Sequence, residues 1–457
     1  MENGLYLESV ENQISSSNAA TVPDVPIEYK VYRRRWLMLG LFMLTTAANA
    51  IQWLQYSIIT DVITDYYNVS SLWVNMTSVI FMIVYIPVFF PCGWILDKYG
   101  LRATVLLGMV STCLGSWLKV FSVSRDLFWL TFLGQTITGI AQPFLLGTPP
   151  SLAAIWFGPG QVSTACSLGV AGNQIGNAVA CLIPPLMVKN NIDKNQVGDD
   201  LRAMFYTVAG VNTVLSLVIF IFFQKAPPTP PSAAQDHLEI QDGYFKFVKR
   251  LLKDRNFLLL LVSCGINIGV FLALSTLLNQ VVLSYYPTAN EDVGQIGLVL
   301  VFAGAIGALL GGVMLDKTLR FKLTSIIFYV ASVIGFLIYT FTLGVGHIYV
   351  VYISCSIIGF FVTGYLTVGF EYAAEITYPE PEGTVSNMVN VSTQIFGIIL
   401  TIIYAIFLDK WGDVASNVTM CVALAIGTVL MAYINAPLRR QEANQKKIQV
   451  KRSQGVK

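Results

Sequence analysis

The sequence contains few charged residues and almost no histidine. Only 12% of its 457 residues are Asp, Glu, Lys or Arg, and two are histidines. Soluble domains carry roughly 25% charged residues. The hydrophobic share is 55% and the mean hydropathy is +0.64, so a soluble fold would have too little polar surface to cover its apolar groups. These values indicate a protein that crosses a membrane many times.

Other absences exclude further classes of function. Lys and Arg number 28 against 26 Asp and Glu, and this near balance gives no reason to expect a nucleic-acid partner. The seven cysteines are scattered without a Cys-x-x-Cys pair, so neither a disulfide framework nor a zinc site is predicted. No nucleophile–base pair or metal cluster stands out at any spacing, so we expect neither an enzyme nor a bound cofactor.

Twelve apolar stretches of membrane-spanning length follow the polar beginning of the chain. About 20 helical residues cross the hydrocarbon core, and backbone groups there must be paired within the segment. The predicted fold class is therefore an all-α membrane protein with 12 transmembrane helices. The spans are expected near 36–60, 73–96, 103–121, 127–149, 163–187, 203–224, 257–284, 293–315, 322–343, 348–370, 384–408 and 415–436.

A long polar stretch separates the sixth span from the seventh. It opens with a proline-rich segment that cannot continue a helix and ends with the basic, amphipathic stretch Tyr244–Arg255, which predicts a short helix on the membrane surface. A plain connecting loop fits the first half of this stretch equally well. The predicted divisions are a cytoplasmic tail (1–35), a six-helix half (36–224), a cytoplasmic linker (225–256), a second six-helix half (257–436) and a second cytoplasmic tail (437–457).

The distribution of basic residues predicts the orientation. With both termini in the cytoplasm, 22 Lys and Arg lie on the inner side and six on the outer side, as the positive-inside rule requires. The sequon at Asn68 then lies in the first outer loop and is a candidate glycosylation site, although such sequons also occur by chance. The six basic residues placed outside are Lys119, Arg125, Lys189, Lys194, Arg202 and Lys410.

Two inner loops carry the same motif. Loop 2–3 contains Gly-x-x-x-Asp-Lys around Asp97, and loop 8–9 repeats it around Asp316, 219 positions later. Two such six-helix repeats resemble the major facilitator superfamily, in which these residues latch helix ends on the cytoplasmic side. A helix-capping aspartate in a positive-inside anchor is the alternative, but the recurrence favours the latch. The candidate gating residues are Asp97, Lys98, Arg102, Asp316, Lys317 and Arg320.

Two glutamines occupy equivalent places in the halves. Gln174 in helix 5 and Gln394 in helix 11 are 220 positions apart. Gln174 lies about 11 residues into its span, roughly 16 Å deep and near the bilayer midplane. A buried carboxamide there needs a partner, either a neighbouring helix or a solute. The symmetric pair favours a substrate site.

Helix 1 carries an unusually polar segment, residues 49–57. Helical spacing places Asn49, Trp53 and Tyr56 on one face, and at least one face of this segment is expected to line a cavity. An anchor in the outer aromatic belt is the alternative for Trp53. The repeat offset of 219 carries Trp53 onto Leu272 in helix 7.

The middle of every predicted span lacks titratable residues. A proton-coupled carrier needs such a group along its path, so facilitated diffusion is predicted. An anionic substrate is disfavoured for the same reason. A cationic substrate can still be held by an aromatic face through cation–π attraction.

Several motifs together resemble the feline leukaemia virus subgroup C receptor family of major facilitator transporters, over about residues 36–436. These motifs are Arg34-Arg35-Trp36-Leu37, residues 49–57, Trp156-Phe157-Gly158-Pro159, Val162-Ser163-Thr164-Ala165-Cys166, Gly172-Asn173-Gln174, residues 275–280, Glu375-Ile376-Thr377-Tyr378-Pro379 with Glu382-Gly383, and residues 390–394. The resemblance implies choline and ethanolamine transport by alternating access, with haem export as an earlier assignment.

The resemblance also implies a substrate site. A helix 1 Trp and a helix 7 Tyr cage the quaternary ammonium in that family, and two glutamines line the pocket. Here these positions hold Trp53, Gln174 and Gln394, but Leu272 replaces the tyrosine, and the neighbouring Phe271 points about 100° away on the helix. Asn49 and Tyr56 complete the candidate set.

Three functions follow in order. A choline or ethanolamine uniporter comes first, a haem transporter second and a non-transporting receptor or scaffold third. The haem alternative is weakened because the two histidines, His237 in the linker and His347 before helix 10, lie outside the predicted spans. The expected partners are a small cationic amine or haem, and the lipid bilayer. We expect a monomer in the plasma membrane, with a mitochondrial or other internal membrane as the alternative.

Overall fold

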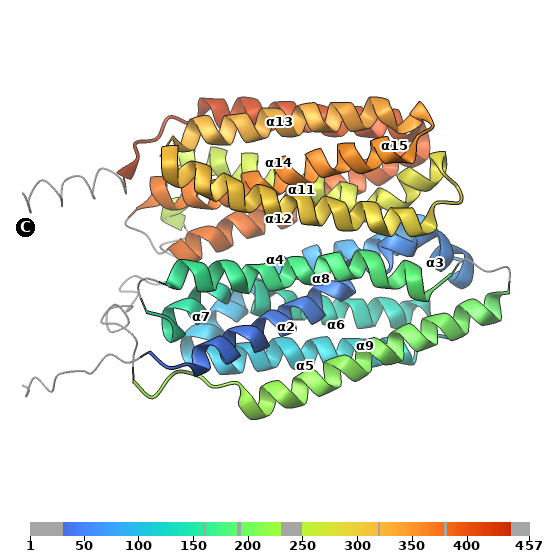
Figure 1. Cartoon of the computed structure of the whole chain (residues 1–457), viewed down its shortest axis with the longest axis horizontal. Coiled ribbons are helices and arrows are strands. Elements are labelled where there is room, and N and C mark those ends of the chain that lie inside the picture. Colours follow the sequence, from blue (N-terminus) through green and yellow to red (C-terminus); the bar gives the residue numbers. More distant parts are fainter. Residues whose placement is uncertain are drawn as a thin grey trace, which may run out of the picture.

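The computed structural model is an elongated bundle of long helices that run along one common direction (Figure 1). The structure describes residues 31–158, 161–189, 193–229, 249–318, 320–378 and 382–439, and all regular structure in these ranges is helical. His237 and the first part of the predicted surface helix, Tyr244–Arg255, lie outside the described residues.

The first half comprises helices that follow one another closely. They are α2 (Arg34–Leu54), the short η1 (Ser57–Ile59), α3 (Thr60–Tyr67), α4 (Ser71–Tyr99), α5 (Leu101–Val120), α6 (Phe128–Leu146), the short α7 (Pro149–Trp156), α8 (Val162–Met187) and α9 (Lys194–Phe222). The second half comprises α11 (Arg255–Tyr285), α12 (Asn290–Thr318), α13 (Phe321–Thr342), η3 (Leu343–Val345), α14 (Ile348–Thr377) and α15 (Glu382–Tyr433).

The helices account for the twelve predicted spans. Ten helical stretches in the described ranges are long and apolar enough to cross a membrane, and the 19-residue α6 adds one more crossing. The last stretch, α15, supplies two, because it breaks at Gly412, where φ is 82°. Ser392 near its start bonds to Leu261 of α11, and Asn435 just beyond its end bonds to Asn256 of α11. The chain therefore reverses at Gly412, and the predicted fold class is confirmed.

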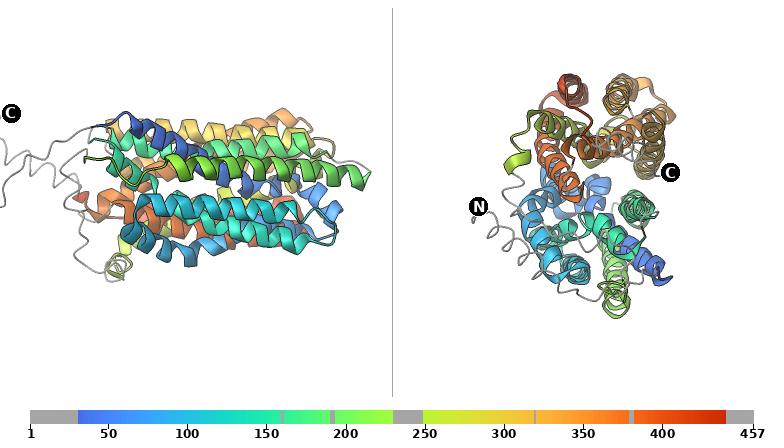
Figure 2. Two further views of the ribbon diagram at one scale, coloured as in Figure 1. Left: turned by 90° about the horizontal axis from the view of Figure 1, so that it is seen from below. Right: turned by 90° about the vertical axis from the view of Figure 1, so that its left-hand side faces the viewer.

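The two halves lie side by side, with α2–α9 and α11–α15 forming separate groups (Figures 1 and 2). Helices α8 and α12 pack together across the interface, as do α4 and α15. Within the halves, α2 packs on α8 and α11 packs on α15. Counted as membrane crossings, α2 and α8 are helices 1 and 5, whereas α11 and the first part of α15 are helices 7 and 11. The two halves thus contain equivalent helix pairs.

Small residues allow α2 and α8 to approach closely. A Cβ atom on Gly176 of α8 would lie 2.4 Å from the carbonyl oxygen of Ala47, and one on Gly172 would lie 2.7 Å from the Cα atom of Met43. Glycines spaced four apart let helix backbones meet without a hydrophobic driving force between them. The glycines that flank Gln174 therefore fix the position of its helix against helix 1.

The bundle has two distinct ends. At one end, called here the terminal end, the described chain begins at residue 31 and finishes at residue 439. The other end, called the distal end, carries α3 and the start of α12 (Figure 1).

Candidate functional site

Helix 1 is interrupted close to the predicted substrate residues. The α-helix ends at Leu54, a turn and the short η1 follow, and α-helical structure resumes at Thr60. The sequence predicted one span over 36–60, whereas helix 1 continues through α3 to Tyr67. An interruption inside a span leaves carbonyl groups that need other partners.

Side chains from three other helices pair with the freed carbonyls. Gln135 of α6 donates from Nε2 to the carbonyl oxygen of Gln52 at 3.0 Å. Ser78 of α4 donates to the carbonyl oxygen of Trp53 at 2.8 Å. The third partner comes from the other half, since Asn279 of α11 donates to the carbonyl oxygen of Ile58 at 3.0 Å. Specific side chains of three other helices therefore stabilise the interruption of helix 1.

Trp53 lies inside the bundle at this interruption. Its exposed fraction is 6%, so the side chain does not face lipid. The indole Nε1 atom is buried and has no hydrogen-bond partner among the described residues. Trp53 belongs to one continuous apolar cluster against which Phe271 and Leu272 of the second half also pack. Residues of helices 1 and 7 thus both contribute to the apolar interior of the bundle.

Leu272 lies where three helices meet. A Cβ atom on Gly397 of α15 would be 2.7 Å from Cδ1 of Leu272 and 3.0 Å from the Sδ atom of Met82 on α4. Gln394 lies one turn before Gly397 on the same helix and is 8% exposed. Leu272 and Gln394 are therefore close neighbours along the interface between the halves.

Two candidate glutamines of the first half, Gln174 and Gln142, lie on different helices. Gln174 of α8 is half-buried, and its Oε1 atom accepts a hydrogen bond from Asn177 of the same helix at 3.2 Å. The sequence reasoning missed Gln142 of α6, which is 9% exposed and has a buried Oε1 atom without a hydrogen-bond partner. Its position in a predicted span was the available signal, but no symmetry mate drew attention to it.

The other two candidates of helix 1 face the interior of the first half. Asn49 donates from Nδ2 to Thr112 Oγ1 at 3.1 Å and to the carbonyl oxygen of Thr138 at 3.0 Å. The ring of Tyr56 lies 6.0 Å from that of Phe205 on α9. Both side chains thus contact helices of their own half.

Lys119 is buried, although the count of basic residues predicts it in an outer loop. It lies in the last turn of α5 and is 1% exposed. Its Nζ atom donates to Gln52 Oε1 at 2.8 Å and to Gln135 Oε1, and lies 5.7 Å from the centre of the Tyr56 ring. The sequence predicts no titratable group in the middle of a span, and Lys119 adds a buried basic group at the end of one.

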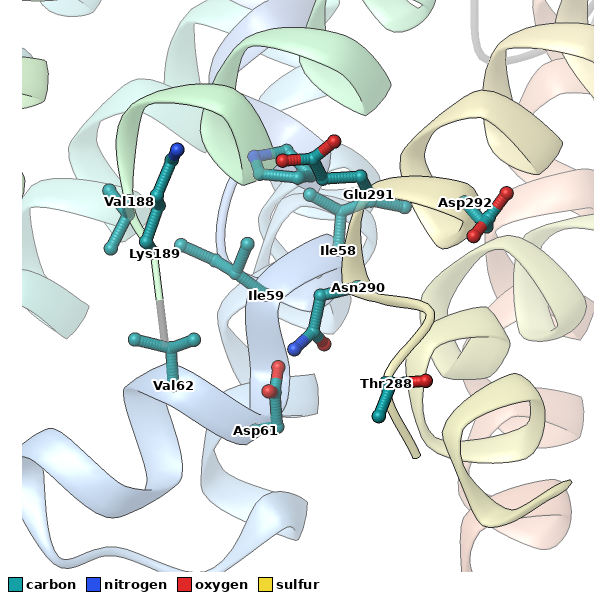
Figure 3. Close-up of a pocket in the computed structure, with 11 residues that line it drawn as sticks. Ile58, Ile59, Asp61, Val62, Val188, Lys189, Thr288, Asn290, Glu291 and Asp292 are labelled. Carbon is teal, nitrogen blue, oxygen red and sulfur yellow. The ribbon is translucent and has the colours of Figure 1, made fainter. Parts of the chain in front are cut away.

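The halves touch at the distal end. Asn279 also donates to Asp61 Oδ1 at 3.2 Å, and Gln280 donates to Asn75 at 2.9 Å. A cavity of about 300 Å³ opens beside these contacts, between helix 1 and the start of α12 (Figure 3). Its lining includes Glu291 and Asp292. The contacts hold the halves together on this side.

The predicted gating residues lie at the terminal end. Lys98 Nζ is 4.7 Å from the centre of the Trp94 ring, and Arg102 donates to the carbonyl oxygen of Phe220 at 2.9 Å. Arg320 is exposed. The side chains of the remaining three, Asp97, Asp316 and Lys317, lie outside the described part of the chain.

Little in the described ranges suits a metal or haem iron. These ranges contain no group of three or more His, Cys, Asp and Glu residues placed to hold a metal ion. His347 is exposed at the distal end, immediately before α14. Asn68 is also exposed there, in the connection between α3 and α4.

Comparison with solved structures agrees with this architecture. The Escherichia coli fucose:proton symporter FucP superposes with a TM-score of 0.62 at 13% identity, covering 88% of this chain and 98% of that one. A bacterial homologue of the human lysosomal transporter Spinster, in an inward-facing conformation, gives 0.63 at 14% identity, covering 89% and 95%. At this identity the likeness concerns the fold alone.

Sequence relatives are much closer. The choline/ethanolamine transporter flvcr2a of Danio rerio is 46% identical over 91% of this chain and 89% of its own length. The human choline/ethanolamine transporter FLVCR2 is 42% identical over 92% and 81%, and FLVCR1 of Felis catus is 43% identical over 90% and 74%. Residues 37–401 match the Major Facilitator Superfamily. The chain is therefore a membrane transporter of the Major Facilitator Superfamily and belongs to its FLVCR family.

Proposed function

We propose that this protein is a uniporter for choline, ethanolamine or both, working by alternating access. The observation that carries the proposal is the 46% identity to flvcr2a along 91% of this chain and 89% of that one. The match extends over both halves of the bundle.

The site supports a small cation as substrate. Trp53 is buried in the core that joins the halves, and its ring offers a face for cation–π attraction worth about 2 kcal/mol or more when desolvated. Gln394 and the unpaired carbonyl oxygen of Gln142 supply acceptors, and Gln174 a carboxamide. We assign substrate contact to these residues, with Phe271 and Leu272 forming the opposite wall.

The proposal extends to orientation and location. The excess of basic residues on one side supports cytoplasmic termini, so that the distal end lies outside and Asn68 is within reach of glycosylation. We also propose that the protein resides in the plasma membrane as a monomer. The repeated Asp-Lys motifs at the terminal end act as the cytoplasmic latch. Among the described residues Lys119 is the one buried lysine or arginine, and its Nζ atom is bonded to two amides. An interior with so few charges supports passive transport.

Uptake of radiolabelled choline, ethanolamine and haem into proteoliposomes tests the proposal side by side. We expect saturable uptake of one or both amines and none of haem. Empty liposomes and the Trp53→Ala variant serve as controls, and both should show only background amine uptake. Haem uptake without amine uptake would overturn the assignment and favour the haem alternative.

A further inference from the structure

We propose that Lys119 is a positioning residue, whose ammonium fixes the interruption of helix 1 and so holds Trp53 in place for the substrate. The proposal rests on the proposed amine transport for its functional consequence. Its structural part rests on the contacts of Lys119 alone.

The ammonium determines which way two amides point. A lysine ammonium has three donors and no acceptor. Because Lys119 donates to the Oε1 atoms of both Gln52 and Gln135, each amide must present its oxygen to Nζ. The Nζ atom also lies 5.7 Å from the centre of the Tyr56 ring. Two amide oxygens and one aromatic ring therefore form a cradle for the ammonium group.

The orientation of Gln135 has a direct consequence for the backbone. With its oxygen turned to Lys119, its Nε2 group is free to donate to the carbonyl oxygens of Gln52, at 3.0 Å, and Thr77, at 3.2 Å. The first of these is a carbonyl that the interruption of helix 1 leaves unpaired. A reversed amide would place two acceptors against each other. Lys119 thus stabilises the broken backbone through Gln135.

Trp53 follows Gln52 directly in the chain, so a shift of that peptide moves the indole. Lys119 donates directly to the side chain of Gln52. It also orients Gln135, which donates to the carbonyl oxygen of Gln52. The residue before the tryptophan is therefore held at two points, directly by Lys119 and through Gln135.

The neighbouring helix is built to admit this side chain. A Cβ atom on Gly134 of α6 would lie 2.9 Å from Cγ of Lys119, so the aliphatic stem needs glycine opposite it. The second half has no such charge at the corresponding place: 220 positions after Lys119 lies Tyr339, which is fully buried. The cradle is thus specific to the half that carries the tryptophan.

Lys119→Met tests the proposal, because it keeps the length of the side chain and removes its donors. We expect KM for choline to rise by roughly tenfold, with Vmax per molecule nearly unchanged. Backbone amide hydrogen exchange in the segment 52–60 should also speed up without substrate. Lys119→Arg should restore both values most of the way, since it returns a charged donor.

Ser116→Ala is the matched control. Ser116 lies one turn earlier on α5, is 2% exposed and accepts a hydrogen bond from Asn212 of α9, away from helix 1. It should leave both KM and the exchange of 52–60 unchanged. Should Lys119→Met fold poorly, Gln135→Glu gives a second test, because it keeps an acceptor for Lys119 and loses the donor to Gln52. It should raise exchange in the same segment.

The outcomes separate the two proposals. Unchanged KM and unchanged exchange in Lys119→Met would overturn the positioning role, as would equal effects in Ser116→Ala. Wild-type vesicles that take up neither amine would refute the proposed function, and the exchange measurement would still decide whether Lys119 fixes the interruption.

Discussion

Leu272 of α11 covers Gly397 of α15, with its Cδ1 atom 2.7 Å from the point that a Cβ atom on the glycine would occupy. This side chain of α11 thus packs against the backbone of α15 at a residue without a side chain, one turn from Gln394. A flat ring in place of the leucine would meet no side chain at residue 397.

Leu272→Tyr should therefore tighten choline binding. A second aromatic face adds about 0.5–2 kcal/mol of cation–π attraction, a few-fold to tens-fold in affinity. Ethanolamine should gain less, because its primary ammonium is met more by hydrogen-bond acceptors. Competition of both amines against labelled choline measures the difference. Leu272→Met, which has a similar volume and no ring, is the control, and an equal gain from it would contradict the aromatic explanation.

Asn279→Ala should favour opening of the distal end. The side chain joins the halves through Ile58 and Asp61, and each hydrogen bond contributes about 1 kcal/mol, or roughly fivefold in the open population. A cysteine placed at Val62, in the cavity wall, should react faster with a polar maleimide in this variant. Asn212→Ala, which removes a buried asparagine within the first half, should leave the rate unchanged. Equal labelling of all three proteins would show that these bonds do not hold the halves together.

Transport should not depend on ion gradients. The buried basic group inside the first half, Lys119, is held by two amide oxygens, which do not exchange protons. Collapse of the pH gradient and replacement of sodium should change initial choline uptake only slightly. A several-fold fall on either treatment would indicate a coupled mechanism instead. Membrane potential must be clamped in these measurements, because the substrate carries a charge.

Gly176→Ala should destabilise the first half, whereas Gly210→Ala should not. A Cβ atom on Gly176 meets the backbone of α2 at 2.4 Å, while one on Gly210 has no atom within 4 Å. Overpacking of this kind costs about 1–3 kcal/mol, and alanine in an open helical position gains up to about 1 kcal/mol over glycine. Thermal unfolding of the purified variants in detergent measures both. A similar loss in the two variants would place the cost in the helix backbone and not in the contact.

The sequence predicts the membrane helices well because hydrophobic length alone specifies a span. All twelve appear, and the repeated spacing correctly puts equivalent helices in equivalent places. The interruption of helix 1 was not predictable, since residues 55–57 contain neither glycine nor proline. The carbonyl oxygens that it frees, on Gln52 and Trp53, are bonded by Gln135 and Ser78, far along the chain. Local signals cannot reveal a break whose partners come from other helices.

Lys119 was misplaced for a related reason. It lies at the end of an apolar run, and counting basic residues assigns such a position to the outer loop. Its burial depends on Gly134, which leaves space for its aliphatic stem, and on two glutamines from α2 and α6 that accept its hydrogen bonds. Those residues are conspicuous individually, but only the packing of three helices shows that they meet.

The reversal at Gly412 links the last two crossings through a single residue, because the helix on each side continues without an intervening loop. A connection of one residue leaves little length in which the two crossings could move independently. We therefore expect a tilt of the segment that carries Gln394 to appear in the final crossing, whose Val422 is 53% exposed. A spectroscopic probe at Val422 would test this from the outer surface of the bundle.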